Sequence, residues 1–258
     1  MSEPGLVFNE VPELYDRARP GYPAELFADL ADLADLGPGS PVLEVGAGTG
    51  HATQPLAGFG CAVTALEPGA DMVAVARRRV GGYPNVTLET STFEDWDARG
   101  ARFDAVVAAS SWHWVDPAIG WRRAHELLKP GGRLALVGNV VFRKTDEPEV
   151  YAETADLHEQ FAPGDPAWGH PPLEDEARAA PADWSDRFEQ PTVLWYPAVQ
   201  WLDGAGFADM LRTNSPYRKL APAVREPLLD AIADRIRTRM GDRAARRYLT
   251  VLRVGRAI

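Results

Sequence analysis

A glycine-rich segment carries the clearest chemical signal in this sequence. Gly46, Gly48 and Gly50 follow the apolar run 41–45, and Glu67 closes the next apolar run, 21 residues after Gly46. Glycines at a turn between a strand and a helix let the backbone approach a ligand closely. An acid at this distance is placed to accept hydrogen bonds from the two hydroxyls of a ribose. The combination predicts a nucleoside site, and a plain tight turn beside a surface glutamate is the alternative.

The kind of nucleoside follows from two departures from the dinucleotide pattern G-x-G-x-x-G. His51 stands at the sixth place, where that pattern has a glycine beside the pyrophosphate. Glu44 lies just before the loop, and a carboxylate there repels a pyrophosphate but attracts a cationic ammonium group. Both residues favour a positively charged nucleoside over NAD. An NAD-dependent oxidoreductase remains an alternative, weakened further by the lack of a readable Tyr-x-x-x-Lys pair.

Regularly alternating elements surround the glycine-rich segment. Short apolar runs predict strands at 41–45, 62–66, 86–88, 103–108 and 133–137. Helical periodicity and capping residues predict helices at 23–36, 51–58, 71–80 and 116–128. Strands and helices that alternate in this way form βαβ units. The sequence therefore predicts an α/β fold with a doubly wound, mostly parallel sheet.

Three segments resemble the motifs of a known enzyme family. Val42-Leu43-Glu44-Val45-Gly46-Ala47-Gly48-Thr49-Gly50, Ala65-Leu66-Glu67-Pro68 and the run 127–134 resemble, in order and spacing, class I S-adenosylmethionine-dependent methyltransferases. Two further segments, 15–23 and 111–116, are similar to a small-molecule subgroup that includes trans-aconitate methyltransferase-like proteins. The resemblance implies a Rossmann-like sheet with an antiparallel final strand, a mainly helical insertion after the fifth strand, and S-adenosyl-L-methionine as cofactor.

The same resemblance implies which residues hold the cofactor. The backbone of the glycine loop would cradle its methionine part, Glu44 would face its amino group, and Glu67 would take the ribose hydroxyls. The expected cofactor-binding residues are Tyr15, Arg19, Glu44, Gly46, Ala47, Gly48, Gly50, Glu67, Thr92, Phe93 and Ser110.

Among the residues outside the glycine loop are Tyr15, Arg19, Thr92 and Phe93. Thr92 and Phe93 follow the third strand, where related enzymes enclose adenine, although Phe93 also fits a purely structural place in the core. Tyr15 and Arg19 belong to an N-terminal arm that would fold over the cofactor. Arg19 could pair with the cofactor carboxylate through two hydrogen bonds, and a solvated charge on a helix is its alternative.

The acceptor would lie beyond the carboxyl ends of the strands, as ligands do in open α/β sheets. The fourth strand ends near Ala109, which brings His113 and its neighbours Trp112 and Trp114 to that crevice. An imidazole with a pKa near 6.5 suits a general base at neutral pH, so His113 is the candidate catalytic residue. Residues 139–142, after the fifth strand, are expected to form another wall, with Phe142 as a candidate substrate residue. Packing over the sheet edge is the structural alternative for the Trp-His-Trp run.

The chain divides into three expected parts. Residues 1–37 form the arm and helix over the cofactor, 38–142 the cofactor-binding core, and 143–258 a helical lid or substrate insertion with closing strands. Residues 146–189 carry a net charge of −11 and residues 212–256 one of +8. These stretches are either two solvated faces or surfaces that pack together as a lid.

Composition narrows the function classes. The 258 residues carry a net charge of −10, which works against a general nucleic-acid binder. One cysteine excludes an internal disulfide and a multi-cysteine zinc site, and the five histidines show no metal-ligand spacing. With no visible secretory signal and no apolar run of about 18 residues, we expect a cytoplasmic protein that does not span a membrane. The expected partner is a small-molecule acceptor, and no oligomeric state is predicted. A cofactor-binding protein without transfer activity, or with a different reaction, is the non-enzymatic alternative.

Overall fold

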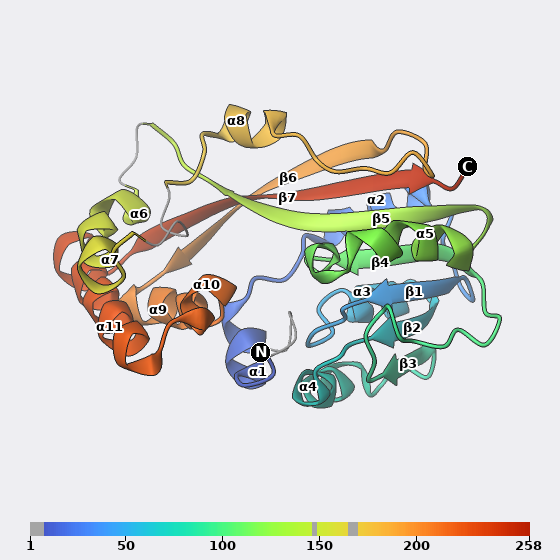
Figure 1. Cartoon of the computed structure of the whole chain (residues 1–258), viewed down its shortest axis with the longest axis horizontal. Coiled ribbons are helices and arrows are strands. Elements are labelled where there is room, and N and C mark those ends of the chain that lie inside the picture. Colours follow the sequence, from blue (N-terminus) through green and yellow to red (C-terminus); the bar gives the residue numbers. More distant parts are fainter. Residues whose placement is uncertain (1–7, 146–148, 165–169) are drawn as a thin grey trace.

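The computed structural model describes residues 8–145, 149–164 and 170–258. A seven-stranded sheet with the order β3-β2-β1-β4-β5-β7-β6 forms its centre (Figure 1). The strands are β1 (Pro41–Val45), β2 (Ala62–Leu66), β3 (Val86–Glu89), β4 (Phe103–Ala109), β5 (Leu128–Phe142), β6 (Thr192–Leu202) and β7 (Ala244–Arg256). β1 to β5 are parallel, and β7 runs antiparallel to its neighbours β5 and β6. The predicted α/β class and the antiparallel final strand are confirmed.

Helices cover both faces of the parallel part of the sheet. They are α2 (Ala24–Leu33), α3 (Thr53–Gly58), α4 (Ala70–Val80) and α5 (Pro117–Leu127), while α1 (Pro12–Ala18) packs against α4. α2 and α3 pack on one face and α5 on the other, so Val42 and Leu43 of β1 lie in two different cores. This double burial explains why β1 is a continuous apolar run. α5 begins as predicted, because the Asp116 side chain accepts a hydrogen bond from the backbone of Ala118.

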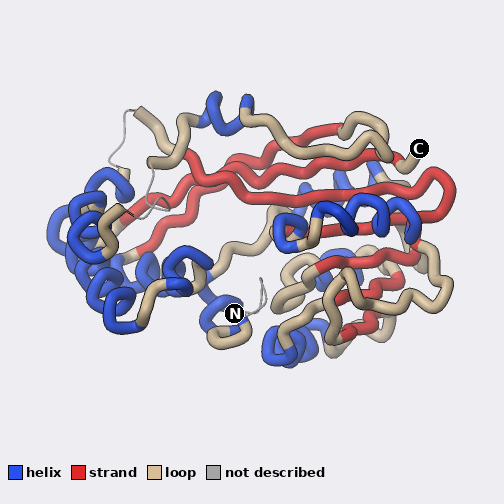
Figure 2. The backbone as a smooth tube through the Cα atoms, viewed as in Figure 1, coloured by secondary structure: helices blue, strands red, loops and turns tan. Residues whose placement is uncertain are grey.

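The last three strands are longer and run past the end of β4 into a group of helices (Figure 2). These helices are α6 (Val150–Glu153), α7 (Ala155–Phe161), α8 (Glu174–Ala179), α9 (Gly204–Arg212), α10 (Ser215–Lys219) and α11 (Pro222–Arg239). α6 to α8 precede β6, and α9 to α11 lie between β6 and β7. The expected helical insertion after the fifth strand therefore comes in two parts that share one core, with Leu157, Phe207 and Ile232 among its members.

The acidic and basic stretches meet where α7 packs on α11. Leu157 and Ile232 contribute apolar contacts, and Arg235 donates a hydrogen bond of 2.8 Å to Asp156 at the rim. Residues 1–7 of the expected arm, and residues 146–148 and 165–169 of the insertion, lie outside the described residues. In the part of the chain that is described, no helix combines the length and apolar character that crossing a membrane requires.

Candidate functional site

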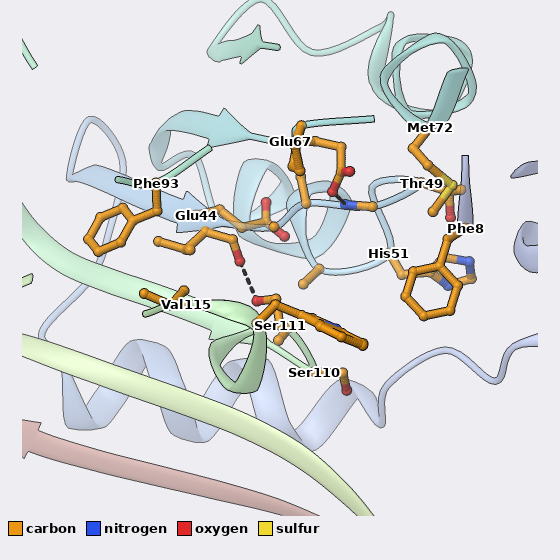
Figure 3. A pocket seen from close by; sticks show the side chains of 18 of the residues that line it. Phe8, Glu44, Thr49, His51, Glu67, Met72, Phe93, Ser110, Ser111 and Val115 are labelled. Atoms are coloured by element: carbon orange, nitrogen blue, oxygen red, sulfur yellow. Dashed lines mark hydrogen bonds between the residues drawn. The ribbon is translucent and has the colours of Figure 1, made fainter. Parts of the chain in front are cut away.

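The glycine loop begins with a sharp turn at the end of β1, where the residues that follow β4 leave little space beside it. Gly46 has a φ of +70°, and a Cβ on it would lie 2.5 Å from Cβ of Ser111. The Ser111 hydroxyl donates a hydrogen bond to the Val45 carbonyl, which ties the residues after β4 to the loop (Figure 3). Glycine is therefore required at position 46 by backbone conformation and by space.

Glu67 holds the loop from its other side. Its side chain is buried, and its two carboxylate oxygens accept hydrogen bonds of 2.9 Å from the backbone amides of Gly48 and Gly69. Burial raises the pKa of Glu67, and the two amides partly offset this rise. Each oxygen has a further lone pair, so the carboxylate can still accept hydrogen bonds from a pair of ligand hydroxyls.

Glu44 is the most unusual side chain of the site. It is only 1% exposed, and its Oε2 has no hydrogen-bond partner among the described residues. Burial raises the pKa of Glu44 to about 7. The Thr53 hydroxyl acts on this carboxylate and lowers its pKa, but an oxygen left without a donor or a cation still costs free energy. Because Glu44 lines a cavity, that group can come from a ligand.

The cavity beside the loop has about 1010 Å³ of empty space, including its mouth toward solvent. Figure 3 shows Glu44, Glu67 and Phe93 around it, with Ser110 and Ser111 on the side of β4. The structure brings ten of the eleven expected cofactor-binding residues to this cavity: Tyr15, Arg19, Glu44, Gly46, Ala47, Gly48, Glu67, Thr92, Phe93 and Ser110. The other one, Gly50, does not line it. With a φ of +86° and an added Cβ 3.5 Å from Ala76, Gly50 instead allows close packing against α4.

The sequence left open whether Phe93 lines the cofactor site or belongs to the core, and in the structure it does both. It lines the cavity, yet it is only 3% exposed. Its ring lies 6.0 Å from the ring of Trp112, and the guanidinium of Arg123 lies 5.5 Å from its centre. Phe93 is thus a core residue with one edge toward the cavity.

The N-terminal arm closes the cavity and is fastened on two sides. The guanidinium of Arg19 donates hydrogen bonds to the hydroxyl and the carbonyl of Thr213, at 2.9 and 2.6 Å, and lies 5.1 Å from the Tyr15 ring centre. Asp16 pairs with Arg79 of α4 at 2.6 Å. Arg19 is therefore no solvated charge on a helix: it joins the arm to the segment after α9.

Ser110 stands at the junction between this cavity and a second one. It has a φ of +59°, which is uncommon for a residue other than glycine. Its amide donates to the Val137 carbonyl at 2.8 Å, and its hydroxyl accepts a hydrogen bond of 3.1 Å from Tyr22. Backbone strain of this kind is common at binding sites, where the surrounding structure maintains it.

His113 and its two tryptophan neighbours line the second cavity. They form a short 3₁₀ helix, Trp112–Trp114, directly after β4. The His113 ring lies 4.8 Å from the Trp114 ring, and in the described part of the chain no group hydrogen-bonds to it. Partial burial lowers the pKa of His113. Trp114 also lines the first cavity, so the two cavities share a wall.

Phe142 is not brought to either cavity. It is 5% exposed and packs with Ala177 of α8 and Leu249 of β7. β5 continues as a regular strand well past the end of β4, and alternation along it turns Phe142 toward α8. Of the expected wall 139–142, Asn139 lines the second cavity, together with Gly138, and both lie within β5.

Several lining residues were not expected from the sequence. Phe8, Thr49, His51 and Val115 line the first cavity, and Arg246 lines the second. Thr49, His51 and Val115 adjoin motif residues, so proximity in sequence is a signal for them. The sequence contains no such signal for Arg246, because this residue lies in the last strand, far from every motif. Across the described ranges, the structure contains no cluster of acidic, histidine or cysteine side chains suited to a metal ion.

The known families and proteins that this chain resembles are methyltransferases. Residues 43–136 match the methyltransferase domain family. An uncharacterized methyltransferase of Mycobacterium tuberculosis is 37% identical over 134 residues, or 52% of each chain. A demethylmenaquinone methyltransferase of Tropheryma whipplei is 33% identical over 135 residues, which is 50% of this chain and 56% of that one. The chain spans about half the length of the curated relatives it matches.

Solved structures extend the likeness to nearly the whole chain. A putative type II methyltransferase from Anaeromyxobacter dehalogenans has a TM-score of 0.61 and 26% identity, covering 92% of this chain and 97% of that one. A methyltransferase from Thiobacillus denitrificans, solved with S-adenosylhomocysteine, has a TM-score of 0.53 and 16% identity. It covers 98% of this chain and 97% of its own, and at that identity the likeness concerns the fold alone.

Proposed function

We propose that this chain, whose residues 43–136 form a methyltransferase domain of the class I fold, transfers the methyl group of S-adenosylmethionine to a small-molecule acceptor. The observation that carries the proposal is the buried, unpartnered carboxylate oxygen of Glu44 beside the glycine loop. An ammonium group is the ligand that this oxygen fits best. A pyrophosphate would face repulsion there, which disfavours NAD.

The residues present fit the cofactor at three points. Glu44 would accept hydrogen bonds from its ammonium group, and the free lone pairs of Glu67 would accept those of its ribose hydroxyls. Thr92 and Phe93, after β3, would enclose the adenine. When bound, S-adenosylmethionine supplies a methyl group already activated by a sulfonium. The protein has then to position the acceptor, exclude water and hold any proton that is released.

His113 is the proposed general base on the acceptor side. Its lowered pKa keeps the imidazole neutral at pH 7, so a ring nitrogen is free to take the proton from an acceptor hydroxyl, amine or acidic carbon. Trp112 and Trp114 would position the acceptor through their rings. The arm and the α9–α10 segment close over the cavities, which suits a small molecule better than a polymer.

Isothermal titration tests the cofactor. S-adenosylmethionine and S-adenosylhomocysteine should bind, while NADH should not, and binding of NADH alone would refute the proposal. Mass-spectrometric detection of S-adenosylhomocysteine, in the presence of an acceptor library, then tests transfer. Tight cofactor binding with no product from any acceptor would instead favour a binding protein without transfer activity.

A further inference from the structure

Arg246 is a buried cation that the proposed chemistry leaves unexplained. It lies in β7, is 6% exposed and lines the second cavity. Its Nε has no hydrogen-bond partner, and no carboxylate within the described ranges forms an ion pair with it. Its guanidinium lies 5.5 Å from the ring centre of Tyr248, which holds the group in place.

A second arginine, the partly buried Arg19, lies close enough to Arg246 for their charges to interact. Burial lowers the pKa of Arg19, and the charge of Arg246 lowers it further. Arg19 donates only to the uncharged groups of Thr213. The two guanidinium groups therefore repel one another, and no carboxylate of the described residues forms an ion pair with either of them.

Several other arginines of the molecule are paired with acids, whereas Arg253, which also lines the second cavity, has a ring contact with Trp195. Arg79 pairs with Asp16, and Arg235 pairs with Asp156. Arg212 pairs with carboxylates of α9 and α11. Arg246 differs from these three because it is buried and has no acid partner among the described residues, and burying an uncompensated charge is costly.

The nearest acids do not supply the missing charge. Glu149 influences Tyr151, which lies beside Arg246, but its two oxygens accept hydrogen bonds from the backbone amides of Tyr151 and Ala152 at the start of α6. Asp183 lines the same cavity from an exposed position and has no ion pair with Arg246. Gln200 lies directly across from Arg246 in the sheet, and its buried amide oxygen also lacks a partner.

We propose that the second cavity binds an acceptor with an oxyanion group, and that Arg246 is the residue that holds this group. This inference rests on the proposed function, since it assigns the second cavity to the acceptor. Arg246 lines the second cavity and not the first, which favours an acceptor group over the carboxylate of the cofactor as its ligand. A guanidinium binds carboxylate and phosphate oxygens through paired hydrogen bonds, and Asn214 and Ser215 in the same wall offer further donors.

The test uses the full chain saturated with S-adenosylhomocysteine, whose binding is measured first by calorimetry. The probes are sodium succinate, sodium benzoate and sodium phosphate, with sodium chloride at equal ionic strength as the salt control. Succinamide and benzamide are the neutral counterparts. A probe at about ten times its Kd should raise the Tm by about 3–5 °C. Whether the carboxylates or phosphate produce this rise shows which oxyanion the cavity binds.

Arg246→Met should abolish this shift, and Arg243→Met is the matched control. Arg243 precedes β7 at an exposed position and stacks on Trp201, 4.1 Å from its ring centre, outside the cavity. Without a probe, Arg246→Met should keep or raise the parent Tm, because it removes an uncompensated charge. A structural arginine, for example one that turns to the free oxygen of Gln200, would lower it.

Three results would overturn the proposal: no oxyanion probe stabilises the parent beyond chloride, the neutral counterparts stabilise it equally, or Arg246→Met keeps the shift. If the methionine variant does not fold, Arg246→Lys decides, since it keeps the charge and loses the paired donors. A reduced shift supports the proposal, and an undiminished one overturns it. Failure of S-adenosylhomocysteine to bind would count against the proposed function instead, and the probes can still be tested on the unloaded protein.

Discussion

The substitution Glu44→Gln should weaken cofactor binding but stabilise the folded protein, so it separates the two effects of this carboxylate. In the free protein the pKa of Glu44 is about 7. A bound ammonium group would favour the ionised carboxylate and hold this pKa below that value. Binding therefore requires loss of a proton when the pH is below 7, and the affinity for S-adenosylhomocysteine should fall as the pH falls. Between pH 7 and pH 5.5 the Kd should rise about fifteenfold.

The stability of the folded protein should depend on pH in the opposite direction from cofactor binding. An exposed glutamate titrates near pH 4.3, whereas the buried Glu44 titrates near 7, so the folded state binds this proton more tightly than the unfolded chain. The stability of the unliganded protein is then fullest below about pH 4.3 with respect to this group, and declines as the pH rises through 7. At pH 8 the ionised Glu44 lowers the free energy of unfolding by up to about 3 kcal/mol. Glu44→Gln removes this loss and should raise the Tm by several degrees.

Calorimetry at several pH values between 5.5 and 7, combined with thermal unfolding at pH 8, measures both effects. This window lies below the titration of an α-amino group, near 7.7–8.0, and above that of an α-carboxyl group. Glu126→Gln is the control, since Glu126 is an exposed partner of Arg122 far from the loop. The reasoning is refuted if the parent Kd is independent of pH in this window, or if Glu44→Gln binds with the parent affinity at pH 7.

Three further substitutions test the other parts of the site. Glu67→Ala should raise the Kd for S-adenosylhomocysteine about tenfold to a hundredfold by calorimetry, because ligand hydroxyls and two loop amides lose their acceptor; an unchanged Kd would exclude Glu67 from the site. Gly46→Ala should destabilise the protein to chemical denaturation by about 1–3 kcal/mol more than Gly39→Ala, since both have a positive φ but only Gly46 faces Ser111; equal losses would contradict this. His113→Gln should lower kcat about 10²–10⁴-fold with an unchanged Kd for the cofactor, and parent turnover would make His113 structural.

The parts of the site that the sequence predicts are those carried by local structure. The glycine loop, Glu44 and Glu67 follow directly from two adjacent strands, and parallel strands place their carboxyl ends at one edge of the sheet. His113 follows from the end of β4 by the same rule. The narrower likeness to trans-aconitate methyltransferase-like proteins stays a prediction, as does the role of each site residue.

The parts that sequence reasoning missed depend on long-range pairing. The direction of Phe142 is decided by the length of β5, which continues beside β7 for five residues after its last pairing with β4. Arg246 reaches the cavity only because β7 runs back along the whole of β6. The partner of Arg19, Thr213, is nearly two hundred residues away. No periodicity within one segment encodes such contacts.

The charges of the two cavities suggest how a cofactor and an acceptor are kept in their places. The first cavity holds two buried carboxylates, Glu44 and Glu67, and the second holds Arg246, which no acid of the described residues neutralises. A cationic nucleoside is thus attracted to the first cavity and an oxyanion to the second, although the chain as a whole is acidic. An acceptor fixed by its anionic end at Arg246 is left with its other end toward Ser110 and Trp114, in the wall that both cavities share. That orientation would point a nucleophile toward the methyl group, and the proposed base His113, in the same cavity, would take its proton.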